Sequence, residues 1–290
     1  MKSDCFSALK ITLCLAVLLC LALQYSPYVR AQSQPPIVLL GEVHDNQDQH
    51  IMRAAFFKAL LETGVRPALL MEQFDREDQS KIDRAIAAIA ASADLPAAIG
   101  ASQVIAAVAD AKGTNASWNW VFYRPFLILA LDHKLPIIAV NVSRADTRLI
   151  YSQGLKANGF KAEVPDDIHA MQTRAIHESH CGMIDLEQAS KMAASQVARD
   201  QWMARQIDIH SNRGVVLLAG NGHVRKDIGV PRWLSEPMRQ HTQAIGYLER
   251  DVPPTATEAT MDSAQFDVVR YTATQQREDP CSKFRKPASK

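Results

Sequence analysis

The chain has 290 residues, of which 47% are hydrophobic and 22% charged, with a formal net charge of +1. This composition is ordinary for a folded globular protein, and the length suffices for one large domain with a sizeable core. The near-neutral charge gives no sign of the basic surface that nucleic-acid binding needs, so we expect no nucleic-acid partner.

The first 31 residues have the pattern of a secretory signal peptide. Lys2 and Lys10 accompany an apolar run at 11–23, and Val-Arg-Ala at 29–31 offers small residues where a signal peptidase cleaves. We predict cleavage after Ala31 and a periplasmic or secreted protein with no stable membrane span. An uncleaved membrane anchor is the alternative, which the shortness of the run disfavours.

After cleavage, we expect a single domain at 32–275 and a flexible C-terminal tail at 276–290. Three of the five cysteines leave with the signal peptide, and Cys181 and Cys281 remain. An even pair in an oxidising compartment predicts a disulfide that ties the tail to a mid-chain loop. Two free thiols are the alternative.

Apolar runs of strand length alternate with helical patterns along the mature chain. The predicted strands are 37–40, 67–71, 137–140, 215–219 and 244–248, with an alternating edge strand at 266–271. The predicted helices are 52–61, two alanine-rich segments within 75–112 that break near Pro96 and Gly113, one after Pro125, 146–154 and 186–210. This order indicates an α/β fold with a mainly parallel central sheet flanked by helices and an alanine-rich helical insertion.

A polar turn is predicted at 114–120. The first predicted helix follows a histidine-rich junction. In that first helix we expect the buried stripe to consist of apolar residues at helical spacing, namely Ile51, Ala54, Ala55, Leu60 and Leu61.

Polar side chains follow the first four strands. Glu42 and His44 follow the first strand, Glu72 the second, Asn141 and Arg144 the third, and Asn221, His223 and Arg225 the fourth. Because ligands bind at the carboxyl ends of parallel strands, this edge is the predicted site. If the first two strands are neighbours, Glu42 and Glu72 meet there.

Carboxylates and imidazoles at one edge can do two kinds of chemistry. Glu42, His44, Glu72 and His223 can hold a divalent metal, or Glu42 can orient His44 as a general base. No Gly-x-Ser-x-Gly elbow and no glycine-rich phosphate loop occurs, which disfavours a serine hydrolase and a nucleotide enzyme.

Several of these residues also have simpler roles. Glu42 can cap the helix that follows it, and His50 is expected to be a surface or packing residue of that helix. Arg144 and Arg225 can be paired structurally. His169, His177 and His180 are expected to be solvent-exposed rather than a second metal site.

Three segments, together with Glu72, resemble the ChaN family of bacterial haem-binding, iron-regulated envelope proteins. They are Ile37 to Asn46 (IVLLGEVHDN), Gln196 to Asp200 (QVARD), and Gly220 to Arg225 (GNGHVR) followed by Gly-Val-Pro at 229–231. The resemblance runs from about Pro36 to Leu248. The family is similar in fold to the Tiki metalloproteases and erythromycin esterases, which implies active-site or metal-binding roles for Glu42, His44, Glu72 and His223.

The resemblance also implies a haem that binds between two protomers of a homodimer, with a tyrosine as iron ligand. Tyr123, Tyr151 and Tyr247 are the candidates, and we choose Tyr123, because the adjacent Arg124 can meet a haem propionate. Many relatives are lipoproteins, but Leu19 precedes Cys20 here, so a soluble periplasmic form is expected.

Three functions are therefore open. The resemblance favours an envelope haem-binding protein of an iron acquisition system. The residues by themselves favour a metal-dependent hydrolase that uses Glu42, His44, Glu72 and His223. The third is a polypeptide-binding envelope module in which those residues have no catalytic role.

Overall fold

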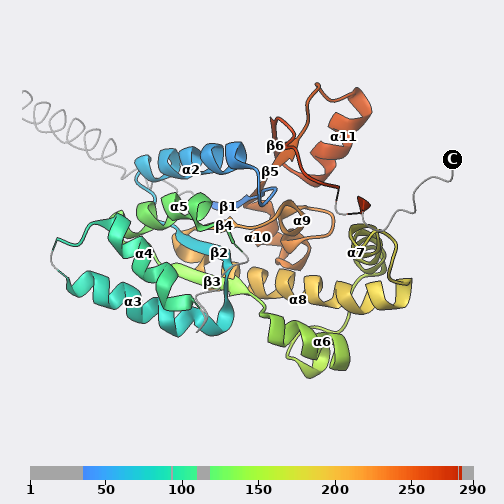
Figure 1. Cartoon of the computed structure of the whole chain (residues 1–290), viewed down its shortest axis with the longest axis horizontal. Helices are drawn as coiled ribbons and strands as arrows, with labels where there is room; N and C mark the ends of the chain where they lie inside the picture. The colour runs from blue at the N-terminus through green and yellow to red at the C-terminus, as the bar shows by residue number, and fades with distance from the viewer. Residues whose placement is uncertain (1–34, 93, 110–117, 280, 283–290) are drawn as a thin grey trace, which may run out of the picture. The chain divides into compact units, whose positions relative to one another are not determined.

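The computed structural model describes residues 35–92, 94–109, 118–279 and 281–282 (Figure 1). The predicted signal peptide, the break at Gly113 and the first part of the turn at 114–120 lie outside this range. Within it, no helix combines the length and the apolar character needed to cross a bilayer.

The centre of the fold is a six-stranded sheet whose paired strands all run parallel. Its strands are β1 (Ile37–Leu40), β2 (Ala68–Asp75), β3 (Ile137–Asn141), β4 (Val215–Leu218), β5 (Thr242–Glu249) and β6 (Val268–Thr272). They lie in the order β3-β2-β4-β1-β5-β6, which confirms the predicted α/β class and the edge position of the last strand.

The condition that the first two strands be neighbours is not met. β1 and β2 are not neighbours, because β4 lies between them and pairs with both, Val215 facing Ile37 on one side and Ala68 on the other. Since all strands are parallel, the exits of β1 and β2 still reach the same edge, and the exit of β4 separates them.

Helices cover both faces of the sheet. The side chains of β1 alternate: Val38 and Leu40 pack on one face, Ile37 and Leu39 on the other. The first face is covered by α2 (Gln47–Glu62), α3 (Gln79–Ala91), α4 (Ala97–Val108) and α5 (Trp120–Asp132). The second is covered by α8 (Leu186–His210) and the 3-10 helix η3 (Val230–Trp233).

A smaller helical layer packs on the first half of α8. It consists of α6 (Arg144–Ala157) and α7 (Asp166–Ser179), both of which lie beside α8 (Figure 1). The three helices share an apolar cluster around Ile150, Ile168 and Val197. The remaining helices are α9 (Asn221–Val224), α10 (Glu236–Gln240) and α11 (Ala256–Gln265), with 3-10 turns η1 (Arg76–Asp78) and η2 (Ser211–Arg213).

α7 and α11 were not predicted, although both carry start signals. Two acidic residues open α7, and Thr255 and Glu258 form a capping box at the start of α11. α6 was predicted to end at Gly154 but continues to Ala157 across a kink, where Gly154 has φ of 80°.

Of the predicted buried stripe of α2, Leu61 is fully buried, Ala54 and Leu60 are partly buried, and Ile51 and Ala55 are exposed. The helix buries Gln49, His50, Arg53, Phe57 and Leu61, whereas Ile51 is 58% exposed. Counting apolar residues fails here because the first two turns of α2 face a buried polar cluster instead of the apolar core. Asn46 caps the helix by accepting the backbone N–H of Gln49.

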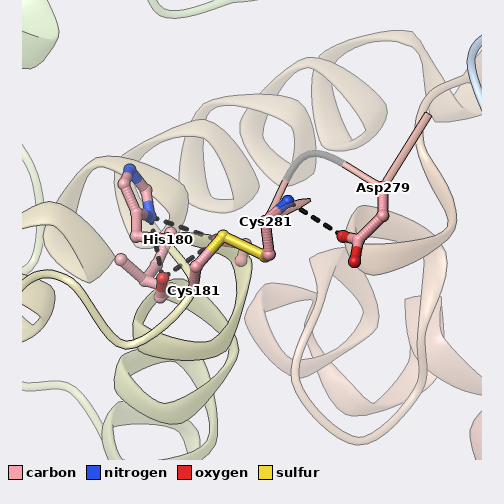
Figure 2. Close-up of a disulfide and its surroundings, with 6 residues drawn as sticks. His180, Cys181, Asp279 and Cys281 are labelled. Atoms are coloured by element: carbon pink, nitrogen blue, oxygen red, sulfur yellow. Dashed lines mark hydrogen bonds between the residues drawn. A yellow bond between two sulfur atoms is a disulfide. The ribbon is translucent and has the colours of Figure 1, made fainter. Parts of the chain in front are cut away.

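The predicted disulfide is confirmed. Cys181 and Cys281 are bonded, with their Cα atoms 5.5 Å apart (Figure 2). The bond joins the turn after α7 to the C-terminal segment.

Two glycines near β4 provide a matched test of packing. A Cβ on Gly229 would overlap the carbonyl oxygen of His223, whereas a Cβ on Gly222 would meet nothing within 4 Å. We expect Gly229→Ala to lower the free energy of unfolding by about 1–3 kcal/mol, since the backbone under His223 has to shift. Gly222→Ala should change it by less than about 1 kcal/mol. Urea denaturation measures both, and equal effects would contradict the packing described here.

Candidate functional site

The loops that leave β1 and β4 are bound to each other at the predicted edge. The backbone N–H of Asn221 donates to the carbonyl of Glu42, and the N–H of Gly41 donates to Ile245 of β5. The Asn221 amide also bridges to the backbone of Tyr247, with distances of 2.6 and 3.1 Å. Asn221 is therefore a structural bridge that holds the two loops in register.

Glu42 lies at the centre of a buried polar cluster. Its Oε1 accepts hydrogen bonds from the Tyr123 hydroxyl at 2.6 Å and from His44 Nδ1 at 2.7 Å. Its Oε2 forms an ion pair with the guanidinium of Arg53, and both side chains are fully buried. His50 Nδ1 lies 3.7 Å from the same oxygen. The carboxylate is therefore held in one orientation by groups from three elements.

Arg53 and His50 are buried parts of this cluster on α2. Arg53 also donates to the carbonyl of Leu40, and burial lowers its pKa to about 10, which leaves it charged at pH 7. His50 donates from Nε2 to the His44 carbonyl and stacks on Phe122. Burial lowers the pKa of His50 to about 4, so its ring is neutral at pH 7.

His44 is the member of the cluster that reaches solvent, with 49% of its side chain exposed. Because Nδ1 donates to Glu42, the neutral ring keeps its lone pair on Nε2. The edge of the ring rests on Trp118, 4.9 Å between centroids. The position of His44 thus combines a fixed tautomer with access to solvent.

A second cluster lies around His223 at the exit of β4. Its Nδ1 is 2.6 Å from Asp200 of α8, and its Nε2 is 3.5 Å from Glu72 of β2. The other oxygen of Glu72 accepts the backbone N–H of Gly220 at 2.8 Å. An imidazole between two carboxylates in a buried site favours the protonated ring.

The pKa shifts of this cluster agree with a charged His223. Burial opposes the charge of His223, but the carboxylates of Asp200 and Glu72 outweigh burial and raise its pKa to about 10. Burial likewise opposes ionisation of Glu72, yet His223 and the Gly220 N–H lower its pKa to about 2. Asp200 is fully enclosed, and burial raises its pKa to about 6.

The two clusters meet at Gly220. A Cβ on this residue would lie 3.1 Å from His44 Nε2 and 3.8 Å from Glu72 Oε2. A side chain at this position would therefore separate the clusters. The structure thus brings together all four predicted residues, with Gly220 between His44 and Glu72.

The divalent metal predicted for these four residues is not supported. Within the described residues, no group of three or more His, Cys, Asp or Glu side chains is arranged to hold a metal ion. Arg53 and Tyr123 occupy the carboxylate of Glu42, and His223 takes up Glu72 and Asp200. What remains is acid–base chemistry, in which His44 Nε2 can accept a proton. The catalytic role of the four residues stays a prediction.

The other polar strand exits lie in separate networks. Asn141 bonds to Asp75 and accepts from Arg199, and Arg225 forms a bidentate pair with Asp227. Arg144 is exposed at the start of α6. Arg53 and Asp200 pair with Glu42 and His223 in the two clusters. A search of the residues that follow strands could not find them, because both lie on helices. A charged residue within an apolar helical stripe is the signal that could have found Asp200.

Tyr123 and Arg124, predicted to bind haem, are placed differently from that expectation. Tyr123 is fully buried, its hydroxyl donates to Glu42, and burial raises its pKa. Arg124 donates to the carbonyl of Ala98. An iron ligand has to be reached by haem and to ionise, so this placement of Tyr123 does not suit that role.

Tyr151 has the opposite surroundings. It is 41% exposed on α6 and lines a cavity of about 660 Å³ between α6, α7 and α8. Apolar walls of the cavity come from Ile176, Ile184 and Met192. The polar lining includes Arg148, His180, Gln196 and Arg199.

The three histidines of the α7 region do not converge on a metal. His169 contacts the hydroxyl of Ser190, and His177 and His180 contact the carbonyls of Ile184 and Ile176. The first is exposed, as predicted, while the other two are partly buried.

A family model described as haem-binding uptake, Tiki superfamily, ChaN matches residues 28–234. The chain belongs to this family. The resemblance found in the three sequence segments is thereby confirmed. No curated protein is significantly similar in sequence.

Three solved structures are similar to this chain, and one of them has a TM-score high enough to show the same fold. A structure described as cofacial heme binding to ChaN of Campylobacter jejuni has a TM-score of 0.60 and 21% identity, covering 81% of this chain and 87% of that chain. A mutant of the erythromycin esterase EreC in its open conformation has a TM-score of 0.41 and 13% identity, with 77% and 74% covered. The type III effector HopBA1 has a TM-score of 0.43 and 14% identity, with 83% and 88% covered.

The buried pair of Glu42 and Arg53 predicts strong energetic coupling. Arg53→Met leaves the carboxylate buried and unpaired, which we expect to lower the free energy of unfolding by about 3–5 kcal/mol. The double variant Glu42→Gln/Arg53→Met should lose less than the sum of the two single variants. Arg225→Met, which removes a partly exposed pair, is the control and should cost about 1 kcal/mol or less. Denaturant titration measures the set, and additive effects would contradict the coupling.

His223 is expected to remain protonated well above neutral pH. Its folded pKa of about 10 exceeds the ordinary value of 6.5. The protonated ring therefore stabilises the fold fully below about pH 6.5, and this contribution is lost as pH rises through about 10. Nitrogen-15 NMR should show one doubly protonated imidazole at pH 8, and its signal should vanish in His223→Gln. A neutral His223 ring at pH 8 would refute the assignment.

Proposed function

We propose that this protein binds haem in the cavity between α6, α7 and α8, with the Tyr151 phenolate as iron ligand. The observation that carries this proposal is the exposure of Tyr151 at the cavity. Four tyrosines lie in the described part of the chain. Tyr123 and Tyr247 are buried, and the Tyr271 hydroxyl donates to Asp262. Membership of the haem-binding ChaN family supports haem as the molecule that this cavity binds.

The chemistry of the cavity suits a porphyrin. Its volume of about 660 Å³ lies in the ordinary range for small-molecule pockets, which is about 300–1,000 Å³. Ile176, Ile184 and Met192 offer an apolar surface to the ring. Arg148 and Arg199 offer positive charge to its carboxylates. Tyrosine ligation is one of the established ways in which proteins hold haem iron.

We further propose that two copies of the chain enclose haem. Leu149, Met183 and Leu186 are 45%, 63% and 62% exposed and come from the elements that form the cavity. Large apolar side chains that are exposed on these elements favour burial by a partner. Heme is bound cofacially in the Campylobacter jejuni ChaN structure, which supports a homodimer here.

The envelope location and the role in iron acquisition belong to the same proposal. A signal peptide at 1–31 is predicted from the sequence, and its residues lie outside the described range. The disulfide between Cys181 and Cys281 supports a periplasmic or secreted protein, because such bonds persist in oxidising compartments.

Haem titration tests the ligand with two matched variants. Wild-type protein should develop a shifted Soret band and a tyrosinate-to-iron charge-transfer band. Tyr151→Phe should lose the charge-transfer band and raise the Kd by about tenfold or more, equivalent to about 1.4 kcal/mol. Tyr123→Phe is the control and should bind as the wild type does.

The pattern of outcomes separates the alternatives. If Tyr123→Phe loses the charge-transfer band and Tyr151→Phe keeps it, the iron ligand is Tyr123. No spectral change with the wild-type protein at micromolar haem would overturn haem binding altogether.

A further inference from the structure

The segment that follows β6 is attached at two places far apart in the sequence. We call residues 273–279 together with Cys281 the C-terminal strap. Near its start, the Ala273 carbonyl accepts a hydrogen bond from Asn46, and the Gln275 N–H donates to Glu249. These contacts place the first part of the strap beside the loop that carries Glu42 and His44.

Arg277 is the first anchor of the strap. Its guanidinium donates to both oxygens of Asp45 and both oxygens of Glu249, each at 2.6 Å. Hydrogen bonds from Arg277 lower the pKa of both carboxyls. Asp45 is adjacent to His44, so Arg277 joins the strap to the loop that carries Glu42 and His44.

The disulfide is the second anchor. Cys281 is bonded to Cys181, which lies in the turn between α7 and α8 directly after His180 (Figure 2). Ser179, His180 and Ile184 of this turn line the Tyr151 cavity. The strap therefore connects the wall of the proposed haem cavity to the loop beside His44.

The backbone of this turn adopts a conformation that is unfavourable for a non-glycine residue. Cys181 has φ of 59° and Gly182 has φ of 67°, two consecutive residues in the left-handed region. A non-glycine residue adopts this conformation only at an energetic cost. Both cysteines are partly exposed, so the disulfide is not enclosed in the core.

We propose that the strap is a redox-controlled latch on the cavity. While the Cys181–Cys281 bond is closed, it orders the turn that forms one cavity wall. A dithiol reductant opens it by thiol–disulfide exchange: the Sγ–Sγ bond breaks, each cysteine gains a proton, and the dithiol is oxidised to a disulfide. The freed turn then has to be ordered again when haem binds, which weakens affinity. The effect on affinity rests on the proposed function.

Hydrogen exchange tests the latch without haem. In oxidised protein, amides at 179–185 should exchange slowly, and reduction with dithiothreitol should speed their exchange by about tenfold or more, while β4 stays unchanged. Cys281→Ser should behave like the reduced wild type whether or not reductant is present. Equal exchange rates at 179–185 in oxidised and reduced wild type would overturn the proposal. Because this comparison uses folded wild-type protein, it does not depend on whether Cys281→Ser folds.

Haem affinity tests the consequence. The Kd of Cys281→Ser for haem should exceed that of oxidised wild type by about tenfold, without loss of the tyrosinate band. Arg277→Gln, which keeps the disulfide and loses the other anchor, should change the Kd less than Cys281→Ser does. Equal Kd values for wild type and Cys281→Ser would refute control of the cavity. If oxidised wild type binds no haem, the proposed function fails while the exchange result still decides whether the latch exists.

Discussion

The buried carboxylate of Glu42 is the constraint on which the rest of the site depends. A charge without solvent needs paired and hydrogen-bonded partners, and here Arg53, Tyr123 and His44 supply them. These requirements decide that α2 turns polar residues inward, that Tyr123 points away from solvent, and that His44 presents Nε2 outward. The same constraint removes Glu42 from the possible metal ligands.

α8 links the two regions of functional interest. Asp200 on its buried side holds His223 at the strand edge, while Met192, Gln196 and Arg199 line the Tyr151 cavity. Neighbouring residues 199 and 200 thus serve different regions, because successive side chains of a helix point about 100° apart. A shift of α8 would therefore affect both regions. The C-terminal strap joins the same two regions on the outside, through Arg277 and Cys281.

Sequence patterns were most reliable where one local rule dominated. The apolar runs located β1 and β4, and the spacing of apolar residues bounded α8 as Leu186–His210. Patterns failed where a residue serves a partner distant in sequence. Arg53 looks like the exposed side of an amphipathic helix until Glu42, eleven residues earlier, is placed against it. Tyr123 was preferred for its neighbour Arg124, but packing buries Tyr123 and turns Arg124 to the Ala98 carbonyl.

By itself, the sequence determined the parallel α/β class, the strand exits that carry Glu42, His44, Glu72 and His223, the pairing of Cys181 with Cys281, and membership of a haem-binding family. Hydrophobic periodicity and motif spacing are local properties, so they can be read along the chain. Only the tertiary structure decided that β4 separates β1 from β2, that Gly220 lies between the two histidine clusters, and that Tyr151 opens on a cavity. Strand order, burial and cavities depend on contacts between distant segments, and those contacts exist only once the chain has packed.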